Sequence, residues 1–207
     1  MTLENAARTS ITSVEFTNYK AFIHYSIRLQ RMNLLVGPNN CGKSTVVGAF
    51  RALWAALRRA KGRSPEIVNG PKGRAYGYWI PHESLPISIE NIHSDYAESD
   101  TTIAFRLSNG NRLLLFFPRE GACCLVLEPE NRRHGAPVSI RKDFPISLSI
   151  VPVLGPVEHQ EGILREETIQ RDQMTHRASR HFRNYWYHFE DGFDQFAALV
   201  ERTWPGM

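Results

Sequence analysis

Cysteine is scarce in this sequence and is placed where it cannot build a cross-linked or metal-bound scaffold. There are three cysteines among 207 residues: Cys123 and Cys124 are adjacent, and Cys41 lies in a glycine-containing segment. Neither a disulfide framework nor a CxxC metal pair can be assembled from these positions, and the eight histidines show no HxxxH or HxxC spacing. This cysteine usage is typical of a protein that works in a reducing cytosol.

Long hydrophobic runs are also missing. Apolar stretches such as Leu113–Phe117 fall far short of the roughly 20 residues that a membrane-spanning helix needs. Residues 1–30 contain no apolar run long enough for a signal peptide. We therefore expect a cytoplasmic protein without a membrane partner.

No charge of one sign dominates. The sequence has 25 Lys and Arg against 21 Asp and Glu, for a formal net charge of +4. This mild excess permits contact with nucleic acid but does not require it. With 42% hydrophobic and 22% charged residues, the composition is that of a soluble globular domain large enough to bury a core.

The first 60 residues predict strands followed by a helix. Over residues 11–36, Ile27 and Leu29 alternate with polar residues, and Met32–Val36 is a mostly apolar run typical of a buried strand. From Lys43 to about Arg59, apolar residues recur at the spacing of one helical face. These residues are Val46, Val47, Phe50, Leu53, Trp54 and Leu57.

The middle of the chain predicts a loop and then an antiparallel sheet. Residues 61–81 mix glycine, proline and basic residues without periodicity, which predicts a long surface loop. Two alternating runs flank Asn109-Gly110, a pair that tolerates positive φ, so a hairpin is predicted there. Leu125–Leu127 and Ile146–Val151 predict further strands.

Beyond Gly162 the pattern is helical. Ala178, Phe182, Tyr185, Trp186 and Phe189 fall on one face, and these aromatic residues are expected to be core residues rather than a stacking surface for nucleic acid. Asp191 is predicted to cap a last helix that ends before Pro205.

The segment with the clearest chemistry is GPNNCGKS, residues 37–44, which satisfies the pattern GxxxxGK[ST] of a Walker A phosphate loop between a predicted strand and a predicted helix. Gly37 and Gly42 allow the backbone to curl so that N–H groups point at phosphate oxygens, and the helix N-terminus faces the same charge. Lys43 is expected to neutralise the β- and γ-phosphates of ATP, Ser44 to bind Mg²⁺, and Thr45 to lie near the α-phosphate. The other loop residues are Pro38, Asn39, Asn40 and Cys41, the last of which is interpreted as a small filler.

Two segments at the start of the chain resemble those of RecF-like and OLD-family ATPases. FTNYKAF, residues 16–22, and MNLLVGPNNCGKSTVVGAFRAL, residues 32–53, match the opening strands and GxNxxGKS loop of that group over about 45 residues. VPVLGPVEHQEG, residues 151–162, and HRASRHFRNYWYHF, residues 176–189, also resemble segments of such heads.

The resemblance implies an α/β P-loop NTPase fold of the ABC-ATPase-like head type, with residues 1–207 forming one incomplete head. Residues 1–60 would hold the first strands, the P-loop and a helix, and residues 61–84 a basic loop. Residues 85–162 would form an antiparallel β subdomain, and residues 163–207 the C-terminal helices of a helical arm.

The resemblance also nominates two residues outside the loop. Gln160 takes the place of the glutamine that reaches Mg²⁺ and the attacking water in such heads, although it could equally be an exposed loop residue. Lys20 takes the basic position of the first segment and is a candidate nucleotide contact; the alternative is a solvated surface lysine.

A Walker B Asp-Glu pair, a signature serine loop and a switch histidine are not recognisable. LVLEPE, residues 125–130, resembles a Walker B strand and makes Glu128 a degenerate candidate, but no Asp occupies the magnesium position and the preceding residues read as a hairpin. By the resemblance, the missing elements are expected beyond Met207.

The first functional hypothesis is an ATPase head that dimerises around ATP and controls an activity directed at DNA or at phage infection. The second is an ATP-binding scaffold that organises a partner effector, such as a nuclease, with little turnover. A small-molecule P-loop kinase is disfavoured by the strand-rich region after the first helix. The basic residues between Arg58 and Arg74 and those of residues 177–183 are candidate DNA contacts, although the favoured interpretation is that they solvate the surface.

Overall fold

A computed structural model of the protein describes residues 9–87, 92–94, 99–131, 138–151, 159–172 and 177–206. The chain divides into two compact units, Met1–Leu148 and Ser149–Met207. The first unit combines one antiparallel sheet with a long helix, and the second is helical. The predicted combination of helices and a sheet in one chain is confirmed.

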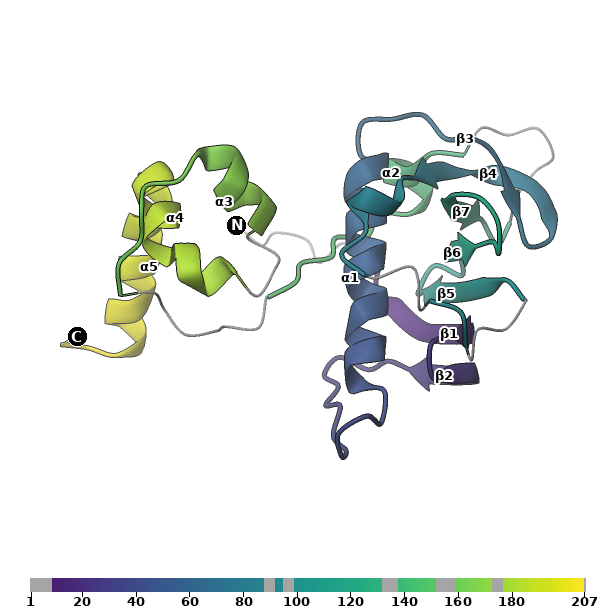
Figure 1. The fold of residues 1–207 in the computed structure, drawn as a ribbon, viewed down its shortest axis with the longest axis horizontal. Coiled ribbons are helices and arrows are strands. Elements are labelled where there is room, and N and C mark those ends of the chain that lie inside the picture. The colour runs from purple at the N-terminus through teal and green to yellow at the C-terminus, as the bar shows by residue number, and fades with distance from the viewer. Residues whose placement is uncertain are drawn as a thin grey trace, which may run out of the picture. The chain divides into compact units, whose positions relative to one another are not determined.

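The described residues of the first unit form a seven-stranded sheet in the order β2-β1-β5-β6-β7-β4-β3, and every neighbouring pair is antiparallel (Figure 1). The strands are β1 (Ile11–Tyr19), β2 (Phe22–Arg28), β3 (Glu66–Gly70), β4 (Gly73–Ile80), β5 (Thr101–Leu107), β6 (Arg112–Phe117) and β7 (Cys123–Glu128). The predicted hairpin is confirmed: β5 pairs with β6, and Gly110 in the turn has a φ of 85°. The predicted strand at Leu125–Leu127 lies within β7.

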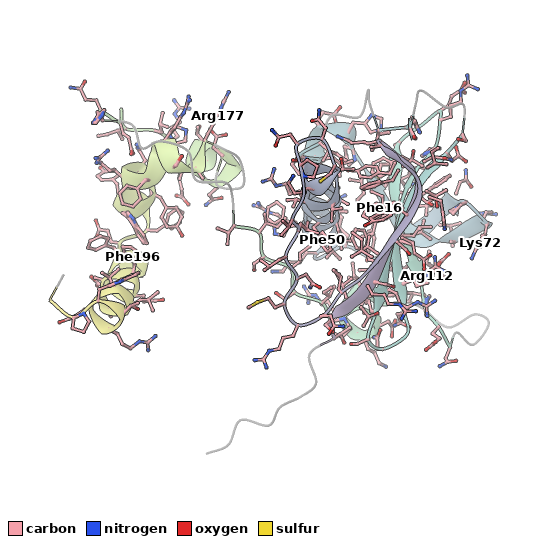
Figure 2. The ribbon with its side chains drawn as sticks, turned by 90° about the horizontal axis from the view of Figure 1, so that it is seen from below. Phe16, Phe50, Lys72, Arg112, Arg177 and Phe196 are labelled. Carbon is pink, nitrogen blue, oxygen red and sulfur yellow. The ribbon has the colours of Figure 1, made fainter. Side chains whose placement is uncertain are left out.

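The prediction of a loop over residues 61–81 was wrong, because this stretch folds into the β3–β4 hairpin. Val68 pairs with Ala75, and Lys72 lies at the outer end of the hairpin (Figure 2). A Cβ on Gly77 would lie 2.4 Å from the carbonyl oxygen of Leu125 and 2.7 Å from Cγ2 of Val68. Gly77 therefore lets the hairpin approach β7 closely. Because the glycines of this stretch interrupt the alternation of apolar and polar residues, the sequence did not predict strands here.

Helix α1 (Lys43–Ala60) lies across one face of the sheet, as predicted for Lys43–Arg59 (Figure 1). Its buried residues are mostly alanines, such as Ala49, Ala52 and Ala56, which allow close approach to the larger side chains of the strands. Phe50 of α1 packs edge-on against Phe105, with ring centroids 5.5 Å apart. Figure 2 shows Phe50 and Phe16 between the helix and the sheet.

A smaller apolar cluster lies on the other face of the sheet. It consists of Val68, Ala104, Leu114, Phe116, Cys124 and Val126. Because side chains alternate along a strand, the adjacent residues Cys123 and Cys124 belong to different clusters.

Two predicted strands do not form in the described residues. Met32–Val36 lies outside the sheet, and Met32, Leu34 and Val36 are 82%, 83% and 88% exposed. Ile146–Val151 likewise belongs to no strand, although burial alternates along residues 144–150. An apolar run forms a strand only if another strand pairs with it. In the described part of the chain, no strand pairs with either of these two runs.

Besides α1, the described residues form further helices in both units. They are η1 (His82–Ser84), α2 (Ile140–Asp143), α3 (Glu166–Asp172), η3 (Ala178–His181), α4 (Phe182–His188) and α5 (Glu190–Thr203). The helical character predicted beyond Gly162 is confirmed. The prediction that Asp191 caps the last helix was wrong: α5 begins at Glu190 after Phe189, so Asp191 lies in the first turn.

Aromatic rings join α4 to α5 in the second unit. The ring centroid of Trp186 lies 5.6 Å from that of Phe193 and 5.3 Å from that of Phe196, and Tyr185 lies 5.0 Å from Phe189. The predicted packing role of Tyr185, Trp186 and Phe189 agrees with these contacts.

We predict that Gly77→Ala destabilises the first unit, because the added methyl group would overlap a backbone carbonyl oxygen that cannot move without breaking the β4–β7 pairing. The expected loss in free energy of unfolding is about 1–3 kcal/mol. Urea unfolding followed by circular dichroism measures it, with Gly162→Ala as control because a Cβ there meets nothing within 4 Å. Equal unfolding midpoints for the two variants would contradict the close approach.

Candidate phosphate-binding site

The glycine-rich segment Gly37–Gly42 leads directly into the N-terminus of α1. Gly42 is the N-cap residue with φ 90° and ψ 5°, and Asn40 also has a positive φ of 64°. No side chain caps the helix, and its first turn contains no acidic residue. The free N–H groups of this turn and the positive end of the helix dipole therefore face the loop without a competing carboxylate from the same turn.

Lys43 folds back over this loop. Its Nζ donates hydrogen bonds to the carbonyl oxygens of Gly37, at 2.7 Å, and Pro38, at 2.6 Å, and lies 3.6 Å from Sγ of Cys41. In the described part of the chain no carboxylate forms an ion pair with Lys43. Its positive charge is thus held on the loop by neutral carbonyl groups, and phosphate oxygens are stronger acceptors than these.

Both glycines of the motif are required by their surroundings. A Cβ on Gly42 would lie 2.6 Å from the ring of Phe22, and its φ is in the left-handed region as well. A Cβ on Gly37 would lie 2.7 Å from Sγ of Cys41. Any other residue at these positions would force the loop or its neighbours to move, so the curled backbone depends on glycine.

The contact between Gly42 and Phe22 brings the β1–β2 turn to the loop. Lys20 lies in this turn with φ 52°, and its N–H donates to the carbonyl oxygen of Ile92 at 2.8 Å. The turn that contains Lys20 therefore leads to Phe22 beside the loop. A contact between the Lys20 side chain and nucleotide stays a prediction.

The sequence interpretation missed an aromatic cluster beside the loop. The rings of Phe22 and Tyr25 stack with centroids 4.8 Å apart, and Phe16 lies 5.2 Å from Phe22. Tyr25 is 46% exposed and stacks on Phe22, the residue whose ring lies beside Gly42. The recurrence of aromatic residues in the segment FTNYKAFIHY, residues 16–25, was the available signal.

The remaining residues of the motif offer backbone groups, two side-chain amides and two hydroxyls. Pro38, Asn39, Asn40 and Cys41 are exposed, as is Ser44 in the first turn of α1, whereas Thr45 is half-buried. No group of three or more His, Cys, Asp or Glu side chains that could hold a metal occurs among the described residues. A hydroxyl such as that of Ser44 suits Mg²⁺, an ion that takes most of its remaining ligands from phosphate and water.

Gln160 lies in the second unit, whereas the loop lies in the first. Gln160 is exposed, while the side chain of its neighbour Glu161 is only 3% exposed and accepts hydrogen bonds from the N–H groups of Arg183 and Asn184 at the start of α4. The structure gives Glu161 a structural role and leaves the role of Gln160 as a prediction. Most of the related segment, residues 152–158, lies outside the described residues.

Glu128 contacts a residue of the neighbouring strand in the sheet. It ends β7, pairs in register with Arg112 of β6, and forms an ion pair with it at 3.5 Å. Asn109-Gly110 makes the hairpin turn that the sequence predicted, so the residues before LVLEPE do not form a helix-capping signature loop. These observations agree with the sequence argument against Glu128 as a Walker B residue.

The two adjacent cysteines have no chemical role at this site. Burial raises the pKa of the Cys123 thiol well above its usual range, and it raises the pKa of Cys124 to about 11. Both thiols stay protonated at neutral pH and are poor nucleophiles. Cys41, by contrast, is exposed.

Comparison with known proteins places the loop within a matched region. The family model described as AAA ATPase domain matches residues 10–173, which run from the residue before β1 to the residue after α3. No curated protein matches the chain. Among the described residues, no helix combines the length and the apolar character needed to cross a membrane.

We predict that a bound polyphosphate protects Cys41 from alkylation. Cys41 is the exposed thiol, and its sulfur lies beside the Lys43 ammonium group that phosphate oxygens would engage. Labelling with a maleimide, followed by intact-protein mass spectrometry, should add one label, and saturating ATP with Mg²⁺ should slow that addition several-fold. The variant Cys41→Ser should take up no label on the same timescale, and equal rates with and without ATP would contradict the assignment.

Proposed function

Because the chain belongs to the AAA ATPase domain family, we propose that it binds ATP with Mg²⁺ at residues 37–45 and hydrolyses it there. The observation that carries this proposal is the Lys43 ammonium group, which lies over a glycine-rich loop at the uncapped N-terminus of α1. A cationic side chain and free N–H groups that converge on one loop fit a polyphosphate better than any other common ligand.

In this proposal each loop residue has a separate role. The backbone of Gly37, Pro38, Asn39, Asn40, Cys41 and Gly42 curls around the β- and γ-phosphates. Lys43 moves from the carbonyl oxygens of Gly37 and Pro38 to the phosphate oxygens, where it offsets the charge that develops during transfer. Ser44 supplies a hydroxyl ligand to Mg²⁺, and Thr45 lies near the α-phosphate.

We assign supporting roles to two residues outside the loop. Lys20, in the turn next to Gly42, contacts the nucleotide. Gln160 contacts Mg²⁺ and orients the water that attacks the γ-phosphate. The support for Lys20 is the contact of Phe22 with Gly42, and the support for Gln160 is the resemblance of residues 151–162 to the corresponding segment of RecF-like heads.

The finer assignment is to the RecF-like and OLD group of ABC-type heads. Two copies of this chain would sandwich ATP, so that nucleotide controls their association and an activity directed at DNA or at phage infection. The motif FTNYKAF, followed by a GxNxxGKS-like loop, supports this assignment. DNA and an effector protein are the partners that it implies.

A second function, an ATP-binding scaffold with little turnover, is favoured by one specific observation. Glu128, which most resembles a catalytic carboxylate in sequence, is engaged by Arg112 in the sheet. A chain without a carboxylate to activate water would bind ATP tightly and hydrolyse it slowly. Nucleotide would then organise a partner effector instead of supplying energy through turnover.

We predict that Lys43→Ala abolishes measurable binding of ATP with Mg²⁺. Loss of the charge-assisted hydrogen bonds to phosphate removes about 3 kcal/mol or more, equivalent to a rise of roughly a hundredfold or more in Kd. Isothermal titration calorimetry measures the Kd. Lys61→Ala is the matched control, because it removes the same charge at the opposite end of α1 and should leave the Kd unchanged.

The same pair of variants separates the two functions. Steady-state phosphate release that disappears in Lys43→Ala supports an ATPase. An ATP-dependent increase in particle mass, measured by light scattering and lost in Lys43→Ala without detectable turnover, supports the scaffold. Nucleotide binding that survives in Lys43→Ala would refute both.

A further inference from the structure

The first unit contains a basic groove away from the phosphate loop. Its volume is about 410 Å³, and it lies between the C-terminal half of α1 and the stretch Ile140–Leu148. The volume lies within the roughly 300–1,000 Å³ range of ligand-binding clefts. The lining residue of α1 nearest to the loop is Trp54, which follows Lys43 by 11 positions, or about three turns of a helix that rises roughly 1.5 Å per residue.

The groove combines an apolar floor with a cationic rim. Trp54, Leu57 and Phe144 contribute to the floor. Arg58, Lys61 and Arg141 line the rim, and no lining residue is acidic. This combination selects a ligand that carries both apolar and negatively charged groups.

The described residues do not neutralise the three cations. In the described part of the chain none of them forms an ion pair, and Arg58 is instead held over the ring of Trp54, 5.3 Å from its centroid. The arginine is therefore positioned by packing while its charge remains available to a partner.

One wall of the groove has the pattern of a strand without a partner. Along residues 144–148, Phe144, Ile146 and Leu148 are less exposed than Pro145 and Ser147. Among the described residues, the N–H groups of Ser147 and Leu148 have no backbone partner. Consecutive N–H groups of an extended stretch point to opposite edges, so an incoming extended chain on either edge can accept a hydrogen bond from one of them.

We propose that the basic groove binds an extended segment of a partner protein that alternates apolar and acidic side chains, and that this segment pairs with Pro145–Leu148 as an added strand. Apolar side chains of the segment fill the floor, and its carboxylates meet Arg58, Lys61 and Arg141. A nucleic acid strand would satisfy the cations and could stack a base on Trp54, but it has no aliphatic side chains to cover the remaining apolar lining residues, such as Leu57. The site is independent of ATP binding at the phosphate loop.

Fluorescence anisotropy of a labelled synthetic peptide tests the proposal. The probe is a capped peptide of about seven residues that alternates glutamate with valine or phenylalanine, and the matched probe has lysine in place of each glutamate. The acidic peptide should bind and the lysine peptide should not. The double variant Arg58→Glu, Arg141→Glu should weaken the acidic peptide by roughly tenfold or more and should bind the lysine peptide better than the natural chain does.

Matched charge changes outside the groove provide the control. Arg63→Glu with Lys72→Glu alters two exposed cations that do not line the groove, and should leave the affinity for the acidic peptide within a factor of about two at moderate salt. Circular dichroism confirms that both double variants are folded.

Backbone methylation tests the added strand. Two further versions of the acidic peptide carry methyl groups on alternate backbone nitrogens, so that each version blocks the N–H groups along one edge of the peptide. The version whose blocked edge faces residues 145–148 should fail to bind. Equal binding of both would overturn strand pairing. The proposal is also overturned if the two double variants lose affinity equally, or if a single-stranded oligonucleotide binds with the same sensitivity to Arg58→Glu, Arg141→Glu while the acidic peptide does not bind.

Discussion

The close approach of helix α1 to the antiparallel sheet is the constraint on which the rest of the first unit depends. Alanines along the buried side of the helix leave room for the larger strand side chains, and Phe50 anchors the contact at Phe105. The same packing fixes where the helix begins. Because Gly42 lies against Phe22 of β2, the sheet sets the position of the loop that precedes α1.

This arrangement places charge at two ends of one rigid element. At the N-terminal end, Lys43 and free N–H groups meet at the loop. Towards the C-terminal end, Arg58 and Lys61 rim an apolar groove. The two sites differ in chemistry because one presents backbone groups around a single lysine, whereas the other presents an apolar floor among several cations. We propose polyphosphate as the ligand of the first site and an acidic, partly apolar chain as the ligand of the second.

The errors in the strand and loop predictions share one physical cause. Met32–Val36 and Ile146–Val151 have the composition of strands, but in the described residues no strand pairs with either. Residues 66–80 have the composition of a loop, yet they pair with each other and with β7 because glycine permits the approach at Gly77. Strand formation depends on a partner that is distant in sequence, and local composition does not record that partner.

The sequence by itself determined the features that depend on neighbouring residues. The amphipathic run after the glycine-rich segment was sufficient to locate α1, and Asn109-Gly110 located the β5–β6 hairpin, while the phosphate-binding role of the glycine-rich loop stays a prediction. Tertiary structure alone decided the order of the strands, the ring of Phe22 against Gly42, the ion pair that engages Glu128, and the groove beside α1. Turns and helices are fixed by bonds over a few residues, whereas these contacts join segments whose separation along the chain gives no local signal.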